Sequence, residues 1–189
     1  MPTEAPDQPV FYYDLGSPQC YLVAETIMAA LPVVPEWEPV LGSHISAADP
    51  GQTDRAEIEL RAAELGLQPM RWPTRRAPDT ERAMLAATYA KRIGRAVAFS
   101  LAAFRQAFAG GRDLTDENTI LIAGAACEMH PTALRKGIEL ASTQAALHEA
   151  AGRARRAGVT ALPAIQIGNR AFTGENAIQK AATALGQIR

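Results

Sequence analysis

The chain contains few of the residues that build disulfide frameworks and metal sites. Only two of its 189 residues are cysteine and only three are histidine. Two thiols cannot form the disulfide network of a small secreted domain, and we expect both to be free. The histidines, His44, His130 and His148, do not have metal-ligand spacing. Because thiols are also scarce, the sequence argues against a zinc site, and we expect no metal.

Net charge and long apolar runs are also lacking. The formal net charge is −1, so the sequence offers no broad electrostatic basis for binding nucleic acid or an anionic membrane. No apolar run approaches the ~20 residues of a membrane span. Residues 1–9 are acidic and rich in proline, without the basic start and apolar centre of a signal peptide. We therefore expect a soluble, cytoplasmic protein.

The chemically richest stretch of the chain is the junction Asp-Leu-Gly-Ser-Pro-Gln-Cys-Tyr at 14–21. The apolar and aromatic run 10–13 before it predicts a strand, and 18–31 has a helical pattern. Ser17 is a typical helix N-cap and Pro18 a typical first helical residue. The first turn of a helix is electropositive because its N–H groups lack intrahelical partners. The junction thus places Ser17 and Cys20 where enzymes often hold a nucleophile or an anion.

The remaining elements predict an α/β fold of thioredoxin-like type. A second strand is expected within 33–41, where two prolines indicate an edge or irregular strand. A hairpin at 164–173, with its turn at 168–170, precedes a final helix. Between them lies a helical, alanine-rich region. The helices expected after the first are 55–65, 80–93, 96–109, 118–127, 133–140, 143–157 and 177–185. We predict a discontinuous thioredoxin-like domain, 1–53 with 158–189, and a helical insertion domain, 54–157.

Six short motifs, in the same order along the chain, resemble the DsbA-related branch of thioredoxin-fold proteins. They lie at 11–18, 39–42, 77–80, 104–114, 158–164 and 172–176. Within this branch the chain is most similar to 2-hydroxychromene-2-carboxylate isomerases and kappa-class glutathione transferases. The resemblance implies a DsbA-type thioredoxin fold with a helical insertion. It also implies a homodimer, since dimers are common in those classes.

The resemblance further implies a binding site for a thiol cofactor, either glutathione or another low-molecular-weight thiol. In the isomerases and transferases, the serine that matches Ser17 donates a hydrogen bond to the sulfur of glutathione. The proline that matches Pro163 is cis, and the residue before it, here Leu162, offers its backbone to the thiol peptide. A polar pair at the start of the last helix binds the γ-glutamyl group. The cofactor-binding residues expected beside Ser17 are Pro18, Leu162, Pro163, Glu175 and Asn176.

Three further residues are candidates for contact with a small aromatic substrate. His44 follows the second strand and has a side chain suited to acid–base chemistry near neutral pH. Trp72 and Arg75 lie in the loop 68–78, where a cleft between the insertion and the thioredoxin frame would bind an acidic or aromatic molecule. Solvated loop side chains are the alternative for all three.

Cys20 matches the second cysteine of the C-x-x-C motif in disulfide-exchanging relatives, and Ser17 replaces the first. Cys20 is therefore either a lone redox thiol or a buried core thiol. Cys127 is expected on a helix, as a core thiol.

Three functions stay open. The first is an enzyme that uses a bound thiol to isomerise or conjugate a small aromatic or unsaturated substrate. The second is a DsbA-like thiol–disulfide oxidoreductase with Cys20 as its one active-site thiol. The third is a non-catalytic binding protein, since Gln19 and Asn176 replace the tyrosine and aspartate of the resembling enzymes. We favour the first, because serine followed by proline matches that subgroup.

Overall fold

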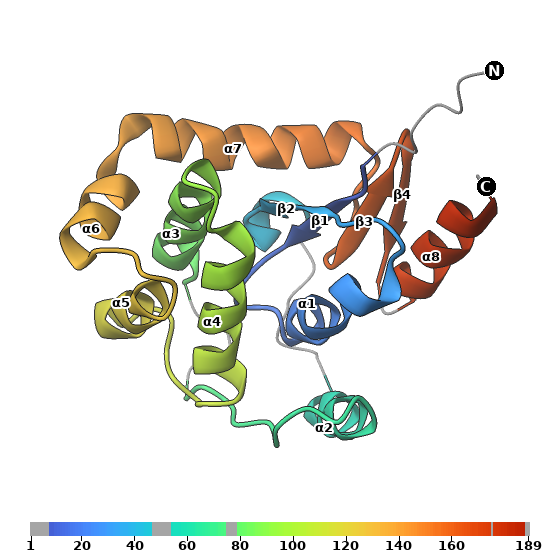
Figure 1. The fold of residues 1–189 in the computed structure, drawn as a ribbon, viewed down its shortest axis with the longest axis horizontal. Coiled ribbons are helices and arrows are strands. Elements are labelled where there is room, and N and C mark those ends of the chain that lie inside the picture. Colours follow the sequence, from blue (N-terminus) through green and yellow to red (C-terminus); the bar gives the residue numbers. More distant parts are fainter. Residues whose placement is uncertain (1–7, 47–53, 75–78, 175, 188–189) are drawn as a thin grey trace.

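The computed structural model describes residues 8–46, 54–74, 79–174 and 176–187. Its sheet contains four strands in the order β2-β1-β3-β4 (Figure 1). They are β1 (Val10–Tyr13), β2 (Glu36–Pro39), β3 (Ala164–Ile167) and β4 (Arg170–Thr173). β1 pairs in parallel with β2 and antiparallel with β3, and β3 and β4 form the predicted hairpin. β2 lies at the sheet edge, as Pro35 and Pro39 indicated.

The predicted helices are confirmed, and their ends agree within two residues with those expected from the sequence. They are α1 (Pro18–Ala30), α2 (Arg55–Glu64), α3 (Glu81–Arg92), α4 (Ala96–Phe108), α5 (Glu117–Ala125), α6 (Pro131–Glu139), α7 (Ala141–Arg156) and α8 (Ala177–Gln187). Within the described ranges, no helix is both long and apolar enough to cross a membrane. The α/β thioredoxin-like architecture with many helices is thus as predicted.

Three local predictions need correction. The start of the predicted loop after β2 is a short 3-10 helix, η1 (Gly42–His44). Arg170 belongs to strand β4, where it pairs with Ile167, and not to the hairpin turn. Cys127 lies after α5, because the helix ends at Ala125 and the following residues form a turn. The thiol is nevertheless buried.

The two faces of β1 pack against different helices. Phe11 and Tyr13 point to one face, where their rings lie 5.1 and 5.5 Å from that of Trp37, and the Tyr13 ring lies 5.9 Å from that of Phe104 in α4. Tyr12 points to the opposite face and packs with residues of α7. Figure 1 shows α7 on one side of the sheet and α1 and α8 on the other. The alternation of strand side chains therefore produces a core on each face.

The larger of these cores continues without interruption from the sheet into α3, α4, α5 and α6. The helices of the middle region therefore share buried apolar surface with the strands that precede and follow them. The division of the chain into two domains stays a prediction.

A buried carboxylate joins the sheet to two of these helices. The side chain of Glu38 in β2 is only 9% exposed. One of its oxygens lies 2.6 Å from Nζ of Lys91 in α3 and 3.2 Å from Nη2 of Arg153 in α7. Lys91 also pairs with Glu36, at 2.7 Å. Glu38 therefore links α3 and α7 through one largely desolvated charge.

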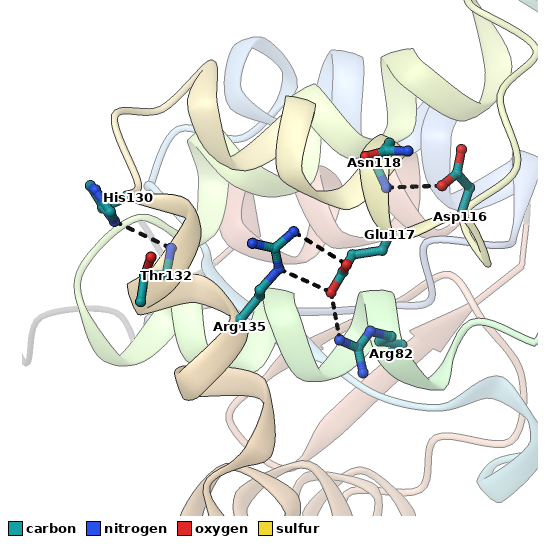
Figure 2. Close-up of polar contacts among 7 residues, drawn as sticks. All are labelled: Arg82, Asp116, Glu117, Asn118, His130, Thr132 and Arg135. Carbon is teal, nitrogen blue, oxygen red and sulfur yellow. Dashed lines mark hydrogen bonds and ion pairs between the residues drawn. The ribbon is translucent and has the colours of Figure 1, made fainter.

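A second carboxylate of the same kind is exposed. Glu117, at the start of α5, pairs with Arg82 of α3 at 2.8 Å and with Arg135 of α6 at 3.3 Å (Figure 2). Its side chain is 40% exposed. Exposed ion pairs contribute little to stability because water and salt screen them.

We predict that Glu38→Gln lowers the free energy of unfolding by about 2 kcal/mol, because it leaves two cations without their largely buried partner. Urea denaturation monitored by circular dichroism gives the difference. Glu117→Gln is the matched control, since it also removes one carboxylate between two cations, and we expect a clearly smaller loss. Equal losses for the two variants would contradict this account of Glu38.

Candidate active site

The turn between β1 and α1 positions Ser17 as the N-cap of α1. Its backbone is extended, with φ −92° and ψ 117°, and its Oγ accepts the N–H of Cys20 at 3.2 Å. The N–H of Ser17 itself donates to the carbonyl of Asp14 at 3.1 Å. Pro18 occupies the first position of the helix, as the sequence predicted. The partly exposed Ser17 hydroxyl therefore sits at the electropositive end of a 13-residue helix.

The proton of the Ser17 hydroxyl has a local acceptor. Oγ of Ser17 donates to Oε1 of Gln19 at 3.2 Å, while it accepts from the backbone of Cys20. A serine hydroxyl has a single proton to donate. Donation to the sulfur of a ligand would therefore replace the bond to Gln19, and the bond from Cys20 would be kept.

Cys20 lies one turn further along α1 and is fully buried. Burial raises the pKa of its thiol to about 12, although polar interactions with the Ser17 side chain and with the backbone of Asp14 partly offset the effect. Since the thiolate is the reactive form, this thiol is protonated and inert near neutral pH. These are the properties of a core thiol, and its assignment as a catalytic residue stays a prediction without support from its surroundings.

The loop before β3 reaches the same end of the sheet. The Leu162–Pro163 peptide bond is cis, the conformation that the resemblance implies. Tyr12 of β1 pairs with Ala164, so Pro163 lies beside the end of β1 where the turn to Ser17 begins. The carbonyl of Pro163 accepts the N–H of Gly174 at 3.1 Å, which ties this loop to the end of β4.

Asp14, which is not among the residues predicted for the site, joins these segments. Its Oδ2 accepts the N–H of Gly42 at 2.7 Å, and its Oδ1 accepts the N–H of Gly16 at 2.8 Å and the hydroxyl of Thr80 at 3.0 Å. Asp14 is 9% exposed, and its pKa is raised because the effect of burial outweighs that of these three hydrogen bonds, which lower it. The available signal was an acidic residue directly after a buried strand and two residues before a glycine.

Two of the three substrate candidates, His44 and Trp72, are not brought together with Ser17 by the contacts that the structure gives them. His44 is exposed, its ring lies 5.9 Å from that of His148 in α7, and its carbonyl accepts from Arg155 at 2.6 Å. The indole N–H of Trp72 donates to Glu59 of α2 at 2.6 Å. These contacts attach His44 to α7 and Trp72 to α2, and their roles toward a substrate stay predictions.

The remaining predicted site residues are described only in part. Asn176 is exposed, and its carbonyl accepts the N–H of Lys180 at the start of α8. Glu175 and Arg75 lie outside the described residues. In the part of the chain that the structure describes, no three His, Cys, Asp or Glu side chains cluster as a metal site would require.

Comparisons with known proteins agree with the fold. A family model, the DSBA-like thioredoxin domain, matches residues 10–186. No curated protein sequence matches the chain significantly. A solved 2-hydroxychromene-2-carboxylate isomerase is similar over 95% of each chain, with a TM-score of 0.82 and 14% identity.

Two further solved structures share the fold. A probable DsbA oxidoreductase of Streptomyces coelicolor is similar over 96% of this chain and 89% of its own, with a TM-score of 0.76 and 17% identity. SrgA of Salmonella enterica serovar Typhimurium is similar over 99% of this chain and 94% of its own, with a TM-score of 0.60 and 13% identity. Likeness at such low identity shows the fold and not the reaction.

We predict that Cys20 of the folded protein reacts with a disulfide reagent on the order of a thousandfold more slowly than an exposed cysteine, because little of it is thiolate. The measurement uses Cys127→Ser, so that one thiol remains, and compares native with urea-unfolded protein. Fast reaction in the native state would contradict the burial argument.

The raised pKa also predicts a pH dependence. Because the folded pKa of Cys20 exceeds the unfolded value of 9.0, its contribution to stability is complete below pH 9.0 and is lost as the pH rises toward about 12. The stability difference between Cys127→Ser and Cys20→Ala/Cys127→Ser should therefore shrink over that range, since all other titrating groups are shared. A difference that is constant with pH would show that Cys20 does not titrate differently on unfolding.

Proposed function

This chain belongs to the DSBA-like thioredoxin family, and we propose that it binds a low-molecular-weight thiol such as glutathione at Ser17. We propose that the bound thiol serves in the isomerisation or conjugation of a small aromatic or unsaturated substrate. The observation that carries the proposal is the placement of Ser17. Its hydroxyl stands at the N-terminus of α1, where the disulfide-exchanging relatives have the attacking cysteine, and next to the end of the sheet that carries cis-Pro163.

The residues of the chain supply two interactions that favour a thiolate. The Ser17 hydroxyl donates a hydrogen bond to the sulfur, and the N-terminus of α1 adds a favourable electrostatic field. When bound, the thiol supplies the nucleophile that the chain itself lacks. A serine in this position is a donor and not a redox group, so the chemistry it supports is addition to an electrophile and not exchange of disulfides.

Other segments would hold the rest of the thiol compound. The backbone of Leu162, before cis-Pro163, would pair with its peptide part as an added strand. The start of α8, next to Asn176, would accept a carboxylate, because the first N–H groups of a helix attract anions. The structural likeness to the isomerase suggests a hydroxychromene-type acid as the first substrate to test.

The two alternative functions fit the site less well. A DsbA-like oxidoreductase needs an accessible thiolate, whereas Cys20 is fully buried and its pKa is raised to about 12. A non-catalytic binding protein is compatible with the fold. It differs from the enzyme in a measurable way, because it would not convert any substrate in the presence of the thiol.

We predict that glutathione binds the purified protein and that Ser17→Ala weakens the affinity by about tenfold, the effect of losing one hydrogen bond to a charged group. Isothermal titration calorimetry measures both. Ser142→Ala, a change of the same size on the exposed surface of α7, is the control and should bind as the wild type does.

Cys20→Ala should also retain binding, because the thiol is not part of the expected contact. Conversion of a hydroxychromene-type acid, followed by its ultraviolet spectrum with and without glutathione, then separates the enzyme from the binding protein. Absence of binding by glutathione, cysteine and coenzyme A alike would refute the proposal.

A further inference from the structure

We propose that Asp14 is the positioning residue of this site. Its carboxylate holds together the chain segments around Ser17 and so fixes the placement of the Ser17 hydroxyl. The inference rests on the proposed function and deepens it by adding the residue on which the donor to the thiol depends.

The carboxylate binds donors from three separate segments. Gly16 is in the turn that carries Ser17. Gly42 begins η1 and lies 28 residues after Asp14, and Thr80 directly precedes α3 and lies 66 residues after Asp14. The three donor–acceptor distances are 2.8, 2.7 and 3.0 Å. All three donors are uncharged, so the carboxylate acts as a shared acceptor and not as half of an ion pair. Hydrogen bonds to a charged acceptor are stronger than those between neutral groups.

Asp14 accepts two hydrogen bonds from the turn that carries Ser17, one through its side chain and one through its backbone. The side chain of Asp14 accepts from Gly16, and its backbone carbonyl accepts from Ser17 at 3.1 Å. The N–H of Leu15, the residue between Asp14 and Gly16, donates to Sδ of Met84 in α3 at 3.2 Å. The three consecutive amides that lead into α1 thus have fixed partners, two of them provided by Asp14.

The same carboxylate holds Gly42, which lies near the side chain of Leu162 in the cis-proline loop. A Cβ at Gly42 would lie 3.3 Å from Oδ2 of Asp14 and 3.8 Å from Cδ1 of Leu162. The segment after β2 therefore lies against Asp14, with the side chain of Leu162 nearby.

The arrangement requires a carboxylate and not merely a polar side chain. An asparagine of the same shape offers one acceptor oxygen and replaces the other by an amide that only donates. With a backbone N–H donating to each oxygen, Asp14→Asn must place a donor against a donor at either Gly42 or Gly16, whereas the hydroxyl of Thr80 can turn to accept. An unpaired buried donor is costly, so the junction has to open there.

The experiment is a double-mutant cycle of Asp14→Asn with Ser17→Ala, read by calorimetric titration with glutathione. We expect Asp14→Asn to weaken binding by about tenfold in the wild type. In the Ser17→Ala background we expect no further loss, because Asp14 acts through Ser17. Equal losses in both backgrounds, or no loss in either, would overturn the proposal. Asp116→Asn is the control: it makes the same change at the exposed N-cap of α5, where Oδ1 accepts from Asn118 at 2.9 Å (Figure 2).

A second readout does not need the thiol and separates the failure of this inference from that of the proposed function. Amide hydrogen exchange should accelerate at Gly16, Gly42 and Ser17 in Asp14→Asn, while amides within α4 keep their protection. If glutathione, cysteine and coenzyme A all fail to bind, the proposed function fails, but the exchange measurement still tests Asp14. Unchanged exchange at these amides would overturn the role of Asp14. If Asp14→Asn does not fold, Thr80→Val removes one donor only, and the same cycle and exchange measurements apply to it.

Discussion

The structure depends on β1 being hydrogen-bonded along both sides. This strand of four residues pairs with β2 on one side and β3 on the other. Its two faces lie in different cores, one through Phe11 and Tyr13 and the other through Tyr12. Because other strands pair with both edges of β1 and apolar cores cover both of its faces, the position of its last residue is fixed. The turn to Ser17 comes directly after that residue, so the sheet fixes where this turn begins.

The rigid turn carries a serine and not a cysteine, and this substitution limits the chemistry. A serine hydroxyl at a helix N-terminus can donate a hydrogen bond and stabilise a negative charge, but it cannot carry electrons in disulfide exchange. The nearby thiol of Cys20 is enclosed in the core and protonated. A reactive sulfur at this site has to come from a bound molecule, which is the reasoning behind the proposed function.

The sequence predicted the elements well, because each depends on local signals. Alternation in 10–13, proline after Ser17 and the glycine turn after Ile167 are short-range patterns with one structural reading. The role of Asp14 was beyond such reasoning, since its partners at Gly42 and Thr80 are neighbours only in the folded chain. The surroundings of His44 and Trp72 were unpredictable for the same reason: tertiary contacts with α7 and α2 decide where these loop side chains lie.

The wide spacing of the residues around Asp14 has a consequence for how the protein folds. The junction needs contacts across 28 and 66 positions of the chain, and β1 must wait for β3, whose residue Gln166 bonds to Tyr12 across 154 positions. Contacts between distant residues require large loops to close, which makes them slow to form. Helices such as α4 and α7 form from local contacts and have no such delay. We therefore expect the end of the sheet that carries Ser17 to form late in folding, and a nascent chain cannot complete this sheet until β3 has been synthesised.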